Sequence, residues 1–168
     1  VEQFQTGAFD ARIFELYLFA YLTRSGYRVQ RNHAQPDFIA TRDGITVAIE
    51  ATTVNPRVPQ LASTDLPPPP ELSAQEIEKK LNDELPIRFG SPLFSRLKKK
   101  YWELPHCNGL PFVIAVEAFH ERYSFRYTDS LLTKYAYGLR NLPKWTKSGK
   151  LVVDYEQIHE HHLGEKVI

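Results

Sequence analysis

Two carboxylates, Asp37 and Glu50, stand on either side of a predicted β-hairpin. Asp43-Gly44 is a two-residue turn signal between two runs that suit strands. Continuing the pairing outward from this turn places Asp37 opposite Glu50, with Cβ atoms about 5 Å apart, and like charges so placed destabilise a sheet. A divalent metal ion between the carboxylates would relieve the repulsion. The alternatives are a register slipped by one residue, or frayed ends at which both carboxylates are solvated.

A third acidic residue, Glu15, lies on a helix predicted over Thr6–Arg24 and ended by Gly26. The helix is apolar or aromatic from Ala11 to Leu22 apart from Glu15 and Arg12, a composition that predicts burial on all sides. A lone carboxylate there is costly unless it has a partner. Two interpretations stay open: an i, i+3 ion pair with Arg12, or a third acidic group that binds the hairpin's metal or orients its water.

A second strong helix is predicted over Ser91–Leu104, with Ser91 as its N-cap. Its apolar residues fall on one stripe: Leu93, Phe94, Leu97, Tyr101 and Leu104. Lys98 and Lys100 border this stripe, whereas Lys99 points away from it. The two bordering lysines are therefore the ones that the helix would hold near the sheet.

The remaining pattern alternates strands and helices, which is typical of the α/β class. Residues 26–31 suit a short strand before the hairpin, and the apolar run 111–119 suits a central strand buried on both faces. A helix that begins with a capping box is predicted over Ser73–Leu85. A further helix is expected from Thr128 to Tyr137, followed by a late strand at 151–153.

The composition is that of an ordinary globular domain. A length of 168 residues suits one domain, and hydrophobic and charged residues make up 42% and 24%. With a net charge of +1, any basic surface must come from local clustering. The single cysteine, Cys107, excludes an internal disulfide framework and a cysteine-ligated metal cluster. Without a signal peptide or a membrane-length apolar run, we expect a cytoplasmic protein that makes no membrane contact. A start at Val1 and the lack of methionine suggest a piece of a longer protein.

Three segments outside the predicted core are candidates for partner contacts. A proline-rich insertion, residues 57–72, contains Pro67–Pro70, a polyproline II run that suits a stiff surface loop or a docking site for a protein. Between Ser130 and Val153 the charged residues are all basic: Lys134, Arg140, Lys144, Lys147 and Lys150. Aromatic residues interleave with them, so the segment suits either nucleic-acid binding or a solvated face. The final histidines, His159, His161 and His162, have a zinc-like spacing but favour a solvated surface.

The order of helix, strand, hairpin, helix and strand, with acidic residues at these places, resembles the restriction-endonuclease-like PD-(D/E)xK nuclease superfamily. The motif is represented by Pro36-Asp37 and, after a gap of 12 residues, by Glu50-Ala51-Thr52. The resemblance covers about Phe9–Phe119 and implies an αβββαβ core with a central mixed sheet flanked by helices. It also implies a single domain over 1–168, with core residues 9–119 and a C-terminal extension over 120–168.

The resemblance further implies a metal-dependent endonuclease that hydrolyses phosphodiester bonds of DNA. Asp37 and Glu50 would hold Mg²⁺ or Mn²⁺ with the Ala51 carbonyl, and Glu15 would support a second metal or a bridging water. Carboxylates suit these ions, which lower the pKa of bound water and neutralise a phosphate. Homodimer formation stays open.

The chain departs from the superfamily at Thr52, where the motif has a lysine. In some members of such a superfamily the following helix provides this lysine, and here Lys98 and Lys100 are the catalytic candidates. Arg96 could stabilise charge but could not act as a base. The candidate nucleic-acid contacts are Arg96, Lys99, Lys134, Arg140, Lys144 and Lys147. Thr52 also leaves open a catalytically inactive nuclease-like domain that binds nucleic acid or a protein.

Overall fold

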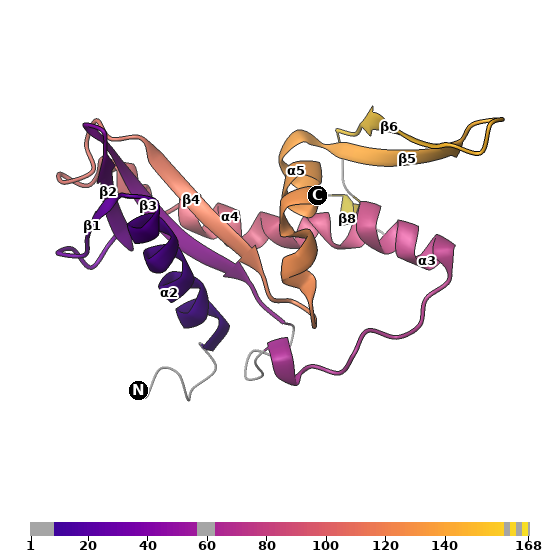
Figure 1. The fold of residues 1–168 in the computed structure, drawn as a ribbon, viewed down its shortest axis with the longest axis horizontal. Helices are drawn as coiled ribbons and strands as arrows, with labels where there is room; N and C mark the ends of the chain where they lie inside the picture. The colour runs from indigo at the N-terminus through magenta and orange to yellow at the C-terminus, as the bar shows by residue number, and fades with distance from the viewer. Residues whose placement is uncertain (1–8, 57–62, 160–161, 164–165, 168) are drawn as a thin grey trace. The chain divides into compact units, whose positions relative to one another are not determined.

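The computed structural model describes the chain except residues 1–8, 57–62, 160–161, 164–165 and 168 (Figure 1). The chain divides into two compact units. Unit 1 is formed by Val1–Pro69 and Ser91–Arg126, and unit 2 by Pro70–Gly90 and Tyr127–Ile168. The candidate carboxylates belong to unit 1, and most of the basic and aromatic C-terminal segment belongs to unit 2.

Unit 1 contains a four-stranded sheet with the order β1-β2-β3-β4. The strands are β1 (Arg28–Gln30), β2 (Phe38–Arg42), β3 (Ile45–Val54) and β4 (Phe112–Ala118). The first three strands pair antiparallel, whereas β3 and β4 are parallel, so the sheet is mixed. Helix α2 (Phe9–Arg24) precedes the sheet, and α4 (Gly90–Leu97) lies between β3 and β4 in sequence. The α/β class and the predicted order of these elements are confirmed.

The β2–β3 hairpin has the predicted register. Its pairs run from Arg42 opposite Ile45 to Phe38 opposite Ile49. Both turn residues have positive φ, 51° for Asp43 and 78° for Gly44. This conformation suits aspartate and glycine and matches the twist of the two strands. The alternative of a slipped register is therefore wrong.

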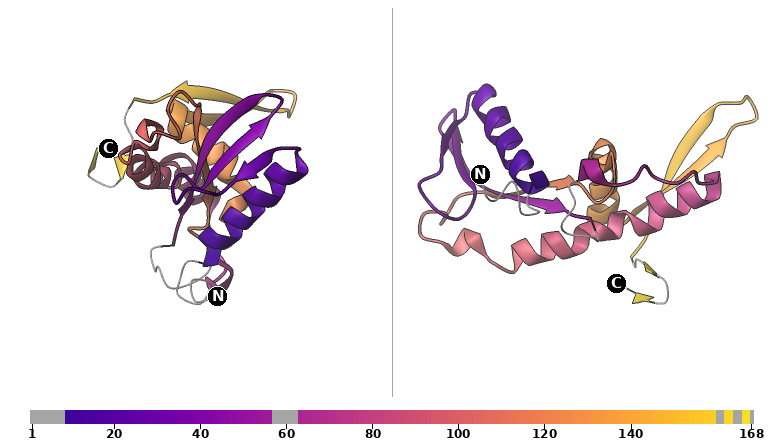
Figure 2. Two further views of the ribbon diagram at one scale, coloured as in Figure 1. Left: turned by 90° about the vertical axis from the view of Figure 1, so that its left-hand side faces the viewer. Right: turned by 90° about the horizontal axis from the view of Figure 1, so that it is seen from below.

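Helix α2 covers one face of the sheet (Figure 2). Its Leu22 packs in a cluster with Phe38, Ala40 and Ile49. The prediction that α2 is buried on all sides is wrong, because in the described structure only Asp10, Phe14 and Leu22 of this helix are buried. The sheet receives one side of the helix, and large side chains of the other side stay exposed, among them Leu16, Tyr17 and Tyr21.

Helix α4 is shorter than predicted. It begins at Gly90, directly after the 3₁₀ helix η3 (Pro86–Phe89), so Ser91 is not its N-cap. The helix ends at Leu97, and Lys100 adopts the left-handed conformation with φ 50°. The apolar pattern of the sequence extends beyond Leu97 because Tyr101 is buried as well. Tyr101 belongs to the next 3₁₀ turn, η4 (Tyr101–Glu103), and not to α4.

Strand β4 is an edge strand, not the central strand that its apolar sequence predicted. Of its residues only Ala118 is buried, and Val113 is 44% exposed. Strand β4 pairs with β3 in parallel, from Ala48 opposite Phe112 to Val54 opposite Ala118, so the backbone of β4 is hydrogen-bonded on one side. Continuous hydrophobicity therefore reflected a parallel strand but not burial on both faces.

Unit 2 combines helices with a second hairpin. Its elements include α3 (Ala74–Lys79), the π-helix η2 (Lys80–Glu84), η3, α5 (Thr128–Tyr137), β5 (Leu139–Trp145) and β6 (Leu151–Gln157). The predicted capping box of Ser73 with Glu76 is present, as are the helix ended by Gly138 and the late strand. Leu85, Phe89 and Leu131 are among the buried residues of this unit.

Two of the three segments predicted to contact partners, the proline run and the final histidines, have little regular structure or lie partly outside the described residues. Pro67–Pro70 is exposed and forms no helix or strand. His159 is exposed, His162 begins the short strand β7 (His162–Leu163), which pairs with β8 (Lys166–Val167), and His161 lies outside the described residues. Among the described helices, none is both long and apolar enough to cross a membrane.

The left-handed turn predicts a specific loss of stability in the Gly44→Ala variant. No atom lies within 4 Å of the added Cβ, so the cost is backbone strain alone, about 1 kcal/mol in the free energy of unfolding. Urea unfolding monitored by circular dichroism measures it. Asp43→Asn is the matched control and should change stability by less than about 0.5 kcal/mol, because asparagine tolerates positive φ. Equal stability of Gly44→Ala and wild type would contradict the turn geometry.

Candidate functional site

Asp37 and Glu50 lie on the sheet face opposite α2. Alternate residues of a strand point to opposite faces, and Ile49 points toward α2. Glu50 therefore shares the other face with Ala48, which packs against Ile39 and Cys107. The segment after α4 covers this second face, since Leu104 packs on the same cluster.

The Glu50 carboxylate is buried beside charged neighbours. Glu50 is 4% exposed, and Nη1 of Arg96 lies 3.2 Å from its Oε1. Burial raises the pKa of the Glu50 carboxyl from its ordinary value of 4.5 to about 7, and the nearby charge of Asp37 adds to the rise. Arg96, Lys99 and the backbone N–H of Asp37 oppose this change. The alternative of a solvated carboxylate is therefore wrong for Glu50. A proton and a cation would compete for its buried carboxyl group.

Asp37 links the two strands of the hairpin at their open end. Its half-buried carboxylate accepts a hydrogen bond through Oδ2 from the backbone N–H of Ala51, at 2.8 Å. Asp37 also raises the pKa of Glu50 through its charge, so the two carboxylates are neighbours as the register predicted. The hydrogen bond from the Ala51 N–H holds the Asp37 side chain against β3, next to the motif residue Ala51.

A pair of histidines, not singled out in the sequence, supports the loop before Asp37. Nε2 of His106 lies 2.7 Å from the carbonyl oxygen of Gln35, two residues before Asp37. The rings of His33 and His106 stack with centroids 3.7 Å apart and planes 5° apart. Because these residues are 73 positions apart in the chain numbering, only the folded structure reveals that they meet.

Glu15 makes the ion pair that the sequence offered as an alternative. Its Oε2 lies 2.6 Å from Nη1 of Arg12 and 3.9 Å from Nη2 of Arg31. Helix α2 packs on the face of the sheet away from Glu50. Accordingly, the described residues contain no group of three His, Cys, Asp or Glu side chains placed to hold a metal ion. The part of Glu15 in metal binding stays a prediction.

The early end of α4 changes which lysine lies near Glu50. Lys99, expected to point away, is the lysine whose charge acts on the Glu50 carboxyl. Lys100 instead pairs with Glu103, at 3.2 Å, and Lys98 is exposed. The backbone N–H of Lys99 bonds to the Arg96 carbonyl at 3.1 Å in the turn that ends the helix. A helical projection misplaced Lys99 because the chain is no longer helical there.

Thr52 is buried on the same face of β3 as Glu50. It is 6% exposed and lies opposite Val116 of β4. A lysine at this position would have to bring its ammonium out of a buried site. The basic groups of the site come instead from Arg96 and Lys99, on the segment that follows β3 in the chain.

Three of the basic residues proposed for nucleic-acid contact are engaged within unit 2. Nζ of Lys134 donates to Oδ1 of Asn82 at 2.9 Å, and burial lowers the pKa of this ammonium. Arg140 pairs with Asp83, and Lys144 with Asp154. Lys147 is exposed in the turn between β5 and β6.

The donor set around Glu50 fits a hard divalent cation. Each carboxylate offers about four lone-pair sites, so the observed bonds leave oxygen atoms of Asp37 and Glu50 for a metal. Burial and the charge of Asp37 disfavour the ionised form of Glu50, and a bound cation would favour it. With the carbonyl oxygen of Ala51, the groups that would hold the ion are all oxygen donors, the type that suits Mg²⁺ or Mn²⁺.

No protein-family model matches this chain, and neither a curated protein sequence nor a solved structure does. What the chain does is therefore inferred from the residues and geometry of the site.

The raised pKa of Glu50 predicts how stability depends on pH in the metal-free chain. A carboxyl with a raised pKa stabilises the fold below its unfolded pKa, and this contribution is lost as pH rises through about 7. Relative to Glu50→Gln, wild type should lose on the order of 3 kcal/mol of unfolding free energy between pH 4.5 and 8. Urea unfolding in EDTA measures this difference.

The matched control for this titration is Glu103→Gln, since Glu103 is an exposed glutamate paired with Lys100. Its unfolding free energy should follow that of wild type at every pH. Parallel curves for wild type and Glu50→Gln would show that Glu50 titrates normally.

Proposed function

We propose that the chain is a metal-dependent nuclease that hydrolyses phosphodiester bonds, with DNA as its substrate and the Asp37–Glu50 pair as its metal site. The observation that carries the proposal is the buried Glu50 carboxyl beside Asp37, with a pKa raised to about 7. A buried carboxylate beside a second carboxylate costs stability, and a cation bound between them would offset that cost.

The charges around the pair suit a phosphodiester substrate. Arg96 and Lys99 bring two positive charges to the same face, and Arg96 is 30% exposed in its side chain. A guanidinium binds phosphate oxygens in a bidentate manner, and an ammonium acts as a point charge. The proposed αβββαβ nuclease fold would place this positive segment over the carboxylates.

Each residue then has a distinct part in hydrolysis. Asp37 and Glu50 hold the cation with the Ala51 carbonyl, and the Asp37 orientation is set by its bond to the Ala51 N–H. When bound, Mg²⁺ or Mn²⁺ supplies a water of lowered pKa and neutralises charge on the phosphate. Arg96 exchanges its contact with Glu50 for one with a phosphate oxygen, and Lys99 stands in for the lysine missing at Thr52.

A second function is favoured by Thr52 and by the Arg96–Glu50 pair. The guanidinium already satisfies part of the charge that a metal would compensate. In this alternative the chain is a catalytically inactive nuclease-like domain that binds nucleic acid or a protein. Metal binding and cleavage distinguish the two functions.

Removal of either carboxylate is expected to abolish cleavage. Wild-type chain with Mg²⁺ or Mn²⁺ should cut labelled DNA, and Asp37→Asn or Glu50→Gln should lower the rate by at least about a hundredfold, since a metal supplies several kcal/mol to such a transition state. Isothermal calorimetry with Mn²⁺ should show binding to wild type and weaker binding to both variants.

Asp43→Asn is the control for the loss of a hairpin carboxylate, because Asp43 is exposed at the turn. It should cleave DNA and bind Mn²⁺ like wild type. Unchanged cleavage in Asp37→Asn and Glu50→Gln would overturn the assignment of the site. DNA binding without cleavage in any divalent metal would favour the inactive alternative.

The lysine that compensates for Thr52 can be identified by three single variants. Lys99→Ala should lower kcat by roughly ten- to a hundredfold, because its charge reaches Glu50. Lys98→Ala and Lys100→Ala should remain within about twofold of wild type. Single-turnover cleavage at saturating metal measures the rates. A defect confined to Lys98→Ala or Lys100→Ala would restore the prediction made from the helical pattern.

A further inference from the structure

The β5–β6 hairpin of unit 2 has two faces of different chemistry. Its antiparallel register runs from Leu139 opposite Gln157 to Trp145 opposite Leu151, and alternate residues point to opposite faces. One face carries Arg140, Leu142, Lys144, Val152, Asp154 and Glu156. The other face, here called the aromatic face, carries Asn141, Pro143, Trp145, Leu151, Val153 and Tyr155.

The large apolar and aromatic side chains of the aromatic face are exposed. Trp145 is 73% exposed and Tyr155 67%, and the aliphatic residues between them, Leu151 and Val153, are 47% and 39% exposed. A contiguous apolar strip of this kind on a two-stranded hairpin marks a surface for interaction. Its aromatic residues are also ones that stack well on planar ligands.

The charges of the hairpin favour a polyanion on this face. Within the described segment 139–157, both acidic residues, Asp154 and Glu156, lie on the opposite face, where Asp154 pairs with Lys144. The turn beyond Trp145 carries Lys147 and Lys150, and both are exposed. The aromatic face therefore carries no carboxylate among these residues, and the positive charges of the turn lie at its outer end.

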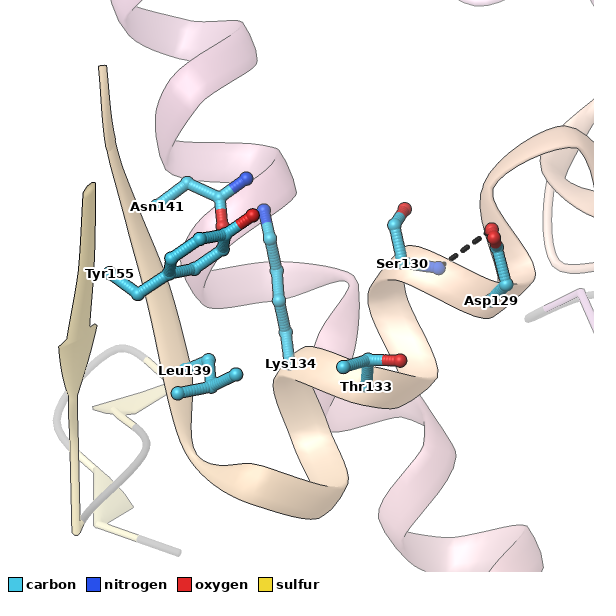
Figure 3. A pocket seen from close by; sticks show the side chains of 7 residues that line it. All are labelled: Asp129, Ser130, Thr133, Lys134, Leu139, Asn141 and Tyr155. Atoms are coloured by element: carbon cyan, nitrogen blue, oxygen red, sulfur yellow. Dashed lines mark hydrogen bonds between the residues drawn. The ribbon is translucent and has the colours of Figure 1, made fainter. Parts of the chain in front are cut away.

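The inner end of the aromatic face opens into a pocket of about 160 Å³. Figure 3 shows the ammonium of Lys134 beside Tyr155 and Asn141, with Asp129 at the far end, where it accepts from the Ser130 N–H. Lys134 is 7% exposed, and its bonds to the Leu81 carbonyl and to Asn82 use two of three donors. The pocket is small for a whole ligand, but its hydroxyl, amide, ammonium and carboxylate groups suit one sugar of a chain.

We propose that the aromatic face binds single-stranded nucleic acid, with bases stacked on Trp145 and Tyr155 and with phosphates beside the turn lysines. Tyr155 lies four residue steps along β6 from the position opposite Trp145, or about 13 Å. A stacked strand rises 3.4 Å per nucleotide, so about four or five nucleotides span both rings. The faces of bases are hidden in a duplex, which leaves these side chains without stacking partners.

This inference goes beyond cleavage and does not depend on it. The aromatic face belongs to unit 2, whereas the Asp37–Glu50 site belongs to unit 1. Binding is therefore measured in EDTA, where the proposed nuclease is inactive. If the nuclease proposal fails, the proposal of single-strand binding is unaffected, and failure of single-strand binding likewise leaves the nuclease proposal unaffected.

Fluorescence anisotropy with a labelled single-stranded oligonucleotide of mixed sequence tests the proposal on the whole chain. Trp145→Ala and Tyr155→Ala should each weaken binding about tenfold or more, as expected for a lost stacking contact. Trp145→Phe and Tyr155→Phe should retain most of the affinity, because they keep an aromatic ring. Lys147→Ala with Lys150→Ala should reduce the dependence of affinity on salt.

Tyr17→Ala is the matched control, since Tyr17 is 61% exposed on α2 of unit 1. It should bind like wild type, and circular dichroism should show every variant folded. Equal affinity of wild type, Trp145→Ala and Tyr155→Ala would overturn the proposal. So would tight binding to vesicles containing anionic lipid that depends on Trp145, in a chain that does not bind the oligonucleotide.

Discussion

The site depends on the register of the β2–β3 hairpin. A slip of one residue would move every side chain of β3 to the other face of the sheet, and Glu50 with it. Two features prevent that slip: the left-handed Asp43-Gly44 turn, and the apolar residues Phe38 and Ile49, which pair under α2. The packing that stabilises unit 1 is therefore the same packing that orients its carboxylates away from α2 and toward the basic segment that follows α4.

In the candidate site, different positive groups compete to offset the charge of the Glu50 carboxylate. Arg96 offsets part of the Glu50 charge, and a proton on Glu50 is the other means of reducing it. Arg96 lies in the last turn of the short helix α4 and belongs to no strand of the sheet. Since a guanidinium and a divalent ion would meet the same carboxylate, the proposed binding of a metal would have to include the free energy of separating Arg96 from Glu50.

The hairpin was predictable from the sequence because its turn chemistry and its pattern are local. The same holds for the capping box at Ser73 and for the helix end at Gly138. The position of Lys99 was not predictable from the sequence, because it depends on the burial of Tyr101. That burial is a tertiary property, and it overrides the helical periodicity. Burial of α2 and β4 was overestimated for a related reason: hydrophobicity indicates what can be buried, and the sheet offers only one face to α2 and one edge to β4. The stacking of His33 on His106 had no sequence signal.

The two units are interleaved along the chain, which passes from one to the other after Pro69, after Gly90 and after Arg126. Synthesis from the N-terminus therefore delivers β1, β2 and β3 before their parallel neighbour β4, and it delivers α3 long before α5. Each unit must close a long loop through the other before its contacts are complete, and the entropic cost of closing a loop grows with its length. Neither unit can be isolated by a single truncation, so an excised fragment would need a circularly permuted or internally shortened gene.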